Sequence, residues 1–237
     1  MDDRAGRLLA RSNLSYRRPA LYDAMMGDDG VVPAVVRLVG GSPAGILDLG
    51  CGTGRHLAAL RDEFGAAAVG VDLQRQMVDY GRQRHGVDLR CGDLRSVRLG
   101  RRFELVTCLG NSLSYLRTDD DLRAAAETLR VHVEDRGIVV ISTLTTPRTE
   151  SVKQTVRVET ELVAASVEVM SAWDAERRLQ LTHRTWRHDD GTTDVDVLRR
   201  RVISVGELDQ VLRRAGFTGI RWVGTGMVVA TLGFDGG

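Results

Sequence analysis

Three glycines at alternate positions follow a short apolar run in the first third of the chain. The stretch ILDLGCGTG (46–54) places Gly50, Gly52 and Gly54 directly after what should be a buried strand. Glycine inside a strand costs roughly 0.5–1 kcal/mol relative to alanine, so this arrangement needs a purpose. Glycine permits positive φ and close approach of a ligand, and a helix beginning near Arg55 would aim free N–H groups at that ligand. The motif therefore predicts a cradle built from main-chain atoms.

Two acidic residues mark the ends of the next two predicted strands. Asp72 ends the segment VGVDL, 18 residues after Gly54, and Asp93 lies in CGDL, 21 residues further on. A carboxylate at the first position can accept hydrogen bonds from both hydroxyls of a ribose, as in nicotinamide-dinucleotide and S-adenosylmethionine sites. The spacing GCGTG departs from the dinucleotide pattern GxGxxG and disfavours a dinucleotide. Asp93 is placed to bind an adenine amino group, with Leu94 as an apolar wall.

Strand and helix patterns alternate between residues 44 and 144, which predicts βαβ units and a parallel sheet. Predicted strands occupy 44–49, 67–73, 87–94, 102–109 and 137–144, and predicted helices occupy 31–41, 55–65, 75–86 and 118–133. Apolar and polar residues then alternate with a period of two, which is typical of an antiparallel sheet with one solvated face. A helix (206–217) and two strands (218–224 and 227–234) follow. We therefore predict an α/β domain from 1–150 and 205–237, with the N-terminal segment as a lid, and an antiparallel β insert at 151–204 over the substrate pocket.

Composition and charge disfavour several functional classes. The chain has 237 residues and a formal net charge of +1, a balance that does not call for nucleic acid or an anionic membrane. Cys51, Cys91 and Cys108 lack metal-ligand spacing and are expected in the core of a protein from a reducing compartment. No apolar run approaches the length of a membrane span, and the acidic start is unlike a signal peptide. We expect a cytoplasmic protein with no metal site and with neither nucleic acid nor membrane as a partner.

Five segments, in order, resemble the class I S-adenosylmethionine-dependent methyltransferases: ILDLGCGTG, VGVDLQRQMV, LRCGDL, FELVTCLGNSLSYL and GIVVIS. The resemblance implies a Rossmann-like seven-stranded methyltransferase sheet and S-adenosyl-L-methionine as the cofactor. The N-terminal tyrosines, GTGRHL, NSLSYL and the β insert are similar to the branch that methylates amino groups of nucleotide-linked sugars and small amines. One departure is VEDRGIVV, which stands where the family often has a Pro-Gly-Gly turn. We expect it to change a turn and to leave the cofactor pocket intact.

The resemblance also implies roles for individual residues. Asp48 would order the glycine loop, Asp72 would bind the ribose, and Asp93 would bind the adenine. The other cofactor-binding residues that it implies are Tyr22, Gly50, Cys51, Gly52, Gly54, His56, Leu73, Met77, Leu94, Leu109 and Gly110. Of these, Leu73 and Met77 would flank the adenine, and His56 is a candidate contact of the cofactor carboxylate.

Three residues are candidates for catalysis: Tyr16, Asn111 and His183. Tyr16 would cover the cofactor from the N-terminal segment, or else belong to the core of an N-terminal helix. Asn111 follows the fourth strand, where it would orient an acceptor or else cap the next helix. His183 shares a strand face with Arg187. If that face lines the pocket, the two are a candidate base and anion clamp; otherwise the face is solvated.

The expected reaction is methyl transfer to a small molecule of secondary metabolism, most simply to an amino group of a biosynthetic intermediate. An alternative keeps the fold and redirects it to an elimination or cyclisation, in which the arginine-rich insert would stabilise an anionic leaving group. A third interpretation is a partner subunit with a degenerate pocket, which the intact glycine loop argues against. The insert also offers sheet edges for a homodimer. The sequence does not identify the acceptor atom.

Overall fold

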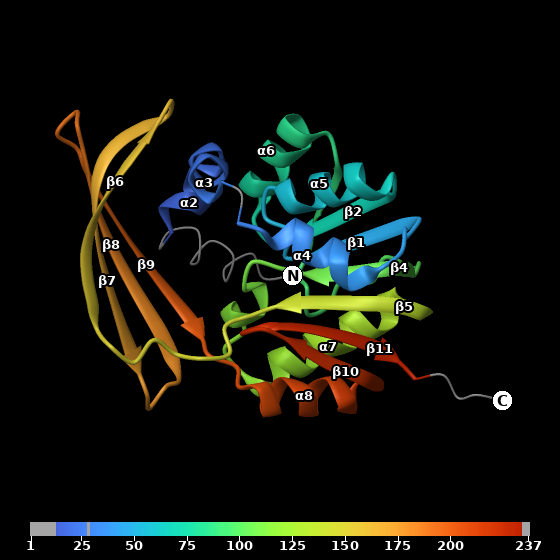
Figure 1. Ribbon diagram of the computed structural model, residues 1–237. Helices are drawn as coiled ribbons and strands as arrows, with labels where there is room; N and C mark the ends of the chain where they lie inside the picture. Colours follow the sequence, from blue (N-terminus) through green and yellow to red (C-terminus); the bar gives the residue numbers. More distant parts are fainter. Residues whose placement is uncertain (1–12, 28, 234–237) are drawn as a thin grey trace. The chain divides into compact units, whose positions relative to one another are not determined.

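The chain folds into two compact units. The computed structural model describes residues 13–27 and 29–233. The four-stranded unit comprises the described residues up to 27 together with 147–202, and the seven-stranded unit comprises 29–146 together with the described residues from 203 onward. Each unit has its own sheet (Figure 1). The sequence-based prediction of an α/β fold with an antiparallel insert is therefore confirmed.

The larger sheet is parallel apart from one strand. Its strands are β1 (Gly45–Leu49), β2 (Ala67–Asp72), β3 (Asp88–Cys91), β4 (Phe103–Cys108), β5 (Val133–Ser142), β10 (Phe217–Val223) and β11 (Met227–Leu232). They lie in the order β10-β11-β5-β4-β1-β2-β3, and β11 runs antiparallel to both of its neighbours. The order reverses between β1 and β4, and open α/β sheets bind ligands at the carboxyl ends of the strands beside such a switch point.

Helices cover both faces of this sheet. They are α4 (Val31–Val39), α5 (Arg55–Phe64), α6 (Arg75–His85), the 3₁₀ turn η1 (Ser112–Tyr115), α7 (Asp119–His132) and α8 (Val205–Arg214). Figure 1 shows α4, α5 and α6 on one face and α7 and α8 on the other. Leu57 and Leu60 are buried in the first of two aliphatic cores, and Leu129 and Leu212 in the second. Apolar side chains are thus buried on both faces of the sheet, which explains why the central strands are mostly apolar.

Local signals set the helix boundaries where the sequence suggests. The Thr118 hydroxyl accepts a hydrogen bond from the Asp121 N–H at 3.0 Å and so caps α7, close to the predicted start of this helix. At the other end of a helix, Gly65 adopts a left-handed conformation with φ 65° and ends α5. Gly86 ends α6 in the same way with φ 62°.

The start of β5 differs from the prediction. The sequence suggests a helix to 133 and a strand from 137, whereas α7 ends at His132 and β5 begins at Val133. Val133 pairs with Phe103, and the register with β4 then shifts before regular pairing resumes. A Cβ at Gly137 would lie 2.7 Å from the Val133 side chain, so the absence of a side chain there permits the irregularity. The segment that replaces the expected turn is therefore part of the strand.

The smaller sheet is an antiparallel meander of β6 (Val152–Thr160), β7 (Val163–Asp174), β8 (Leu179–His188) and β9 (Thr193–Arg201). The alternation of apolar and polar residues continues through 155–165 in the sequence, but a hairpin turn at Glu161 and Leu162 divides this segment. This turn has no glycine or asparagine. Instead, the Thr160 hydroxyl accepts hydrogen bonds from the N–H groups of Leu162 (3.2 Å) and Val163 (3.1 Å).

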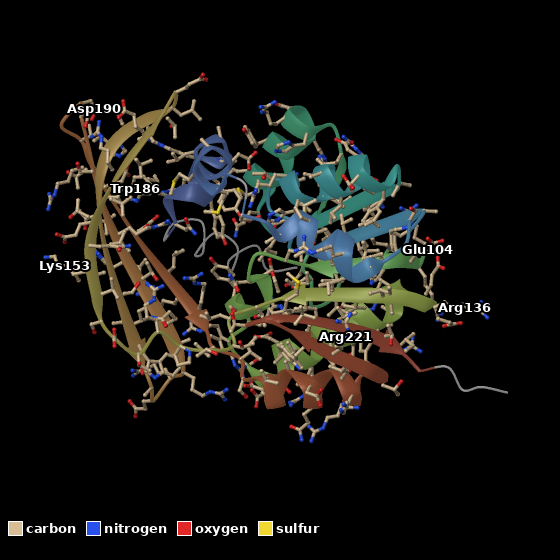
Figure 2. All side chains as sticks on the ribbon, viewed as in Figure 1. Glu104, Arg136, Lys153, Trp186, Asp190 and Arg221 are labelled. Carbon is tan, nitrogen blue, oxygen red and sulfur yellow. The ribbon has the colours of Figure 1, made fainter. Side chains whose placement is uncertain are left out.

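Two short N-terminal helices pack on this meander. They are α2 (Leu14–Arg17) and α3 (Pro19–Met26), and Leu14 and Leu21 join a buried cluster that includes Trp186 (Figure 2). The Leu14 N–H donates to Asp196 Oδ2 at 3.1 Å, and Asp196 also pairs with Arg184 at 2.7 Å. The sequence analysis placed this segment in the cofactor-binding domain, whereas its described part groups with the antiparallel sheet. Of the described helices, none combines the length and the apolar character needed to traverse a lipid bilayer.

Candidate active site

The glycine loop lies at the carboxyl end of β1 and is held by the neighbouring strand. The Gly50 and Cys51 N–H groups both donate to the Val71 carbonyl, at 2.7 and 3.1 Å. Gly50, Gly52 and Gly54 have φ values of 76°, 58° and 76°, all in the left-handed region. Side chains are rarely tolerated there, so the loop conformation requires glycine. The predicted positive φ values are therefore confirmed, and the role of the loop as a cradle for a ligand stays a prediction.

The three glycines are needed for different reasons. A Cβ at Gly50 would lie 2.6 Å from the Ser112 side chain, and a Cβ at Gly54 would lie 2.9 Å from Leu89. At these two positions, packed side chains leave no space for a side chain on the loop. A Cβ at Gly52 would meet only the Met77 methyl, at 3.5 Å. Gly52 is therefore the point of the loop at which a ligand can approach the main chain.

Asp72 joins the end of β2 to this loop. Its Oδ2 accepts a hydrogen bond from the Gly52 N–H, and its Oδ1 accepts one from the Gln74 N–H, each at 2.8 Å. Burial raises the pKa of Asp72, and these backbone hydrogen bonds oppose that rise. Each carboxylate oxygen keeps further lone-pair capacity. The carboxylate is thus fixed in place with acceptor sites to spare, as a ribose-binding residue requires.

Asp93 is brought next to Asp72 by pairing between the strand ends. The Gly92 N–H donates to the Asp72 carbonyl oxygen at 2.9 Å, so the two acids follow adjacent strands of the sheet. Burial acts to raise the pKa of Asp93, but hydrogen bonds from Arg95 and its charge hold that pKa below its ordinary value. Asp93 is therefore an anionic acceptor at neutral pH.

Asp48 is a buried acid beneath the loop. Its carboxyl is 2% exposed, and the Thr107 hydroxyl donates to its Oδ1 at 2.7 Å. Burial, assisted by the nearby charge of Asp72, raises the pKa of Asp48 to about 7 although the Thr107 hydrogen bond lowers it. A buried acid that titrates near neutrality is a group whose protonation a cationic ligand would alter.

The loop after β4 closes on the glycine loop. The Ser112 hydroxyl lies 2.9 Å from the Gly50 carbonyl oxygen and 2.8 Å from that of Leu109, and can donate to either. Gly110 and Asn111 are held by Ser142, through N–H bonds to its hydroxyl (3.0 Å) and its carbonyl (3.2 Å). Leu109, Gly110 and Asn111 are therefore placed beside the glycine loop.

Asn111 has an unusual conformation for its residue type. Its φ is 65°, and its side chain makes no capping hydrogen bond to η1. The capping role that the sequence left open is therefore wrong. The half-buried side-chain amide has no hydrogen-bond partner among the residues that the structure describes. Its donors and acceptor are available to a ligand.

The predicted apolar contacts surround the same loop. Met77 and Leu109 are buried, while Leu73 and Leu94 are half-buried. The Leu94 side chain would lie 3.6 Å from a Cβ at Gly50, whereas Met77, in the first turn of α6, would meet a Cβ at Gly52. Cys51 is half-buried, and burial raises the pKa of its thiol, which remains protonated.

His56 lies at the start of α5, and its Nε2 is 3.0 Å from Asp29 Oδ2. Arg55 binds the same carboxylate at 2.5 Å. Burial acts to raise the pKa of Asp29, but His56 and Arg55 hold it below its ordinary value. Arg55 and His56, which begin α5, thus share one carboxylate of this chain.

Three predicted residues belong to the four-stranded unit. Tyr16 and Tyr22 lie half-buried in α2 and α3. His183 pairs across strands with Met170, which in turn pairs with Lys153. Figure 2 shows Lys153 on the side of the sheet away from α2 and α3, and Trp186 on the side toward them. Because residues in one cross-strand row share a face, His183 lies on the face opposite the buried Trp186 cluster.

Sequence reasoning missed several residues that shape the site. Thr107 and Ser112 bind Asp48 and the glycine loop, and Arg95 binds Asp93. Gly81 lies on α6, where a Cβ would be 2.0 Å from the Thr53 carbonyl oxygen. A glycine inside a helical pattern is a signal of close packing that could have revealed Gly81. The polar residues gave no such signal, because serine, threonine and arginine are common at surfaces.

One histidine and one cysteine differ in burial from what their positions in the sequence suggest. His132, the last residue of α7, is 1% exposed, with Nδ1 donating to the Thr128 carbonyl (2.7 Å) and Nε2 accepting from the Leu99 N–H (3.0 Å). Burial lowers the pKa of His132. Cys91 was expected in the core, but it is exposed at the end of β3. Over the described ranges, no cluster of three or more His, Cys, Asp or Glu residues could hold a metal ion.

The strand order and the motif positions agree with a known family. Residues 46–137 match the family described as "Methyltransferase domain". The match covers less than half of the chain. It agrees with the resemblance to class I methyltransferases that the sequence shows, as do the reversal of strand order at β1 and the antiparallel strand β11. The matched range begins in β1 and ends in β5, and includes the glycine loop and both strand-end acids.

Particular relatives are similar over part or all of the chain. A dTDP-3-amino-3,4,6-trideoxy-alpha-D-glucopyranose N,N-dimethyltransferase from Streptomyces venezuelae is 39% identical over 105 residues, which are 44% of this chain and 44% of that protein. The match thus spans less than half of the relative's length. The structure of Streptomyces venezuelae DesVI has a TM-score of 0.77 at 24% identity, covering 93% of this chain and 99% of DesVI. The structure of SAM-bound CalS10, an amino pentose methyltransferase from Micromonospora echinaspora, has a TM-score of 0.76 at 25% identity, covering 90% of this chain and 95% of CalS10.

Proposed function

We propose that the protein transfers a methyl group from S-adenosylmethionine to an amino group of a nucleotide-linked sugar or a similar small amine. The open main chain at Gly52, with Asp72 and Asp93 at neighbouring strand ends, is the observation that carries this proposal. The named activities of the relatives support the amino acceptor. They do not favour the alternative of an elimination or cyclisation.

The residues present fit the cofactor. Gly52 offers open main chain, and Asp72 offers lone pairs on a carboxylate that the loop itself holds in place. Met77, in the first turn of α6, and Leu94, which follows β3, would bracket an adenine ring. Tyr16 or Tyr22 would cover the bound cofactor, and His56 would lie near its carboxylate end. When bound, S-adenosylmethionine supplies an electrophilic methyl group on a positively charged sulfur.

The chain's own task is to hold the acceptor amine and to control its proton. An amine attacks only through a free lone pair, so it must lose any extra proton beforehand, and burial lowers an amine's pKa. The Asn111 amide is placed to accept a hydrogen bond from the amine and so to aim its lone pair. Alignment of this kind contributes up to roughly 7–11 kcal/mol to catalysis in favourable cases. The ammonium product then releases a proton, for which we assign no base.

His183 is a surface residue in this proposal. It lies on the sheet face opposite the Trp186 cluster, and its neighbour Met170 is 44% exposed. The same face suits a second copy of the chain, because Met170 and Val195 (48% exposed) add apolar area between two sheet edges. We propose a homodimer through this face. Light scattering would show a dimeric mass for the unmodified chain and a monomeric mass for Met170→Glu; a monomeric unmodified chain would exclude it.

A calorimetric titration tests the cofactor, and a product mass tests the reaction. We expect S-adenosylmethionine to bind, and Asp72→Ala to weaken that binding strongly while the protein stays folded by circular dichroism. Incubation with an amino sugar linked to a nucleoside diphosphate should add the mass of one or two methyl groups. Loss of an anion from the substrate, with the cofactor unconsumed, would instead establish the elimination. Failure to bind at millimolar cofactor would remove the proposal.

A further inference from the structure

The carboxylate of Asp93 accepts hydrogen bonds from Arg95, two positions further along the chain. Arg95 Nε lies 3.0 Å from both carboxylate oxygens, and Arg95 Nη2 donates to Oδ2 at 2.6 Å. The backbone N–H of Arg95 donates to Oδ1 at 2.9 Å. A two-point guanidinium contact fixes the plane of a carboxylate as well as its position. Asp93 is thus oriented before any ligand arrives.

Arg95 is itself held by a second acid. The Arg95 Nη1 donates to Asp121 Oδ1 at 2.6 Å. Asp121 lies in the first turn of α7, and its N–H is bonded to the Thr118 cap. The guanidinium therefore spans two carboxylates, one at the end of β3 and one on a capped helix. The Asp93 and Asp121 side chains are only 13% and 24% exposed, so water screens these contacts less than it screens a surface pair.

Asp93 retains capacity for one further donor. A carboxylate has about four lone-pair sites. The three Arg95 donor groups occupy most of them and leave room for an additional hydrogen bond. Arginine has no acceptor, so nothing in this contact competes for the proton that an amino group would donate.

We infer that Arg95 and Asp121 are positioning residues that hold Asp93 in the orientation for recognising the adenine amino group. This inference rests on the proposed function, because it needs an adenine-bearing cofactor. It assigns a part in cofactor selectivity to Asp121 of α7, which belongs neither to the glycine loop nor to the acids at the strand ends. The hydrogen bonds from Arg95 also keep Asp93 ionised, as its lowered pKa indicates, although burial opposes this.

The test compares Asp121→Asn with Asp120→Asn. Both acids are in the first turn of α7, but Asp120 is exposed and pairs with Arg123. The Kd of each variant is measured by calorimetry for S-adenosylhomocysteine and for S-inosylhomocysteine, in which a carbonyl replaces the adenine amino group. We expect Asp121→Asn to reduce the preference for the adenine compound about tenfold, in line with the loss of a hydrogen bond to a charged group. Asp120→Asn should leave that preference unchanged, and Asp121→Glu should restore part of it.

The preference ratio separates positioning from a structural role. If Asp121→Asn weakens both compounds equally, Asp121 merely stabilises α7 and the inference is overturned. An unchanged ratio of the two Kd values also overturns the inference. Arg95→Lys keeps the charge but loses the two-point contact, and it provides a second variant for the same measurement. If the unmodified chain binds neither compound, the proposed function fails together with this inference. If it binds S-adenosylhomocysteine and the ratio does not respond to Asp121, only this inference fails.

Discussion

Asn111→Gly separates two explanations for an asparagine in a left-handed conformation. The backbone of Asn111 has φ 65° and ψ 28°, and its amide neither caps η1 nor bonds to another described residue. Asparagine is one of the few residues with a side chain that adopt this conformation readily. It is therefore either a substitute for glycine or a residue selected for its amide. Glycine keeps the turn and removes only the amide.

The two effects on stability should nearly cancel. The left-handed region costs an ordinary L-residue roughly 1–2 kcal/mol, and less for asparagine, and glycine avoids this cost. Glycine loses more backbone entropy on folding, by roughly 0.5–1 kcal/mol. The free energy of unfolding in urea should therefore change by less than about 1 kcal/mol. Loss of one hydrogen bond to the acceptor should lower kcat/KM by about 2- to 10-fold, from roughly 0.5–1.5 kcal/mol.

The assay measures methylated product and urea unfolding on the same preparations. Asn111→Asp is the matched control, since it keeps the shape and the turn and retains an acceptor oxygen. The kcat/KM of both variants is measured across pH, because Asn111→Asp also introduces a titratable charge. We expect the kcat/KM of Asn111→Asp to lie above that of Asn111→Gly. If Asn111→Gly is fully active and equally stable, the amide has no role in aiming the acceptor, and the residue serves the turn alone.

Three further outcomes are expected. In the folded state the pKa of Asp48 is raised from 3.8 to about 7, so the folded protein keeps a proton that the unfolded chain releases. The resulting stabilisation is complete below the unfolded pKa and is lost as pH rises through about 7. The free energy of unfolding should therefore fall by roughly 2–3 kcal/mol between about pH 5 and pH 8. Asp48→Asn should abolish this difference in urea unfolding, and an unchanged slope would contradict the assignment. Gly81→Ala should destabilise the protein by roughly 1–3 kcal/mol and weaken cofactor binding, since its Cβ would be 2.0 Å from the Thr53 carbonyl. Gly206→Ala, also within a helix but with nothing within 4 Å, is its control and should be neutral or stabilising. His183→Ala should leave kcat/KM within about twofold of the unmodified chain, because His183 lies on the face opposite the Trp186 cluster; a loss beyond tenfold would restore it as a candidate base.

The backbone of the cofactor site was predictable because each of its parts has a local signal. Glycines with positive φ and acids at strand ends follow from rules that act within a few residues, whereas the hydrogen bond from Gly52 to Asp72 was not predicted. The partners of those acids were not predictable in this way. Arg95 and Asp121 are 26 positions apart, and only the folded sheet and α7 bring them together.

The boundaries of elements were harder to predict where side chains replace the usual turn residues. Thr160 supports a hairpin turn that has no glycine, and β5 begins four residues early because Val133 can pair with Phe103. The burial of His132 likewise depends on Leu99, which a helical pattern cannot reveal. Tertiary contacts decided each of these cases against the local pattern.

The bond between the Leu14 N–H and Asp196 has a consequence for how the chain is made. Its two ends are 182 positions apart, so on the ribosome the first helices emerge long before the strand that receives them. Until β9 is synthesised, the apolar faces of Leu14 and Leu21 have no Trp186 cluster to enter. Closing so long a loop is slow, and the interval exposes apolar surface. We therefore expect the N-terminal helices to dock late during biosynthesis and to depend on chaperones until they do.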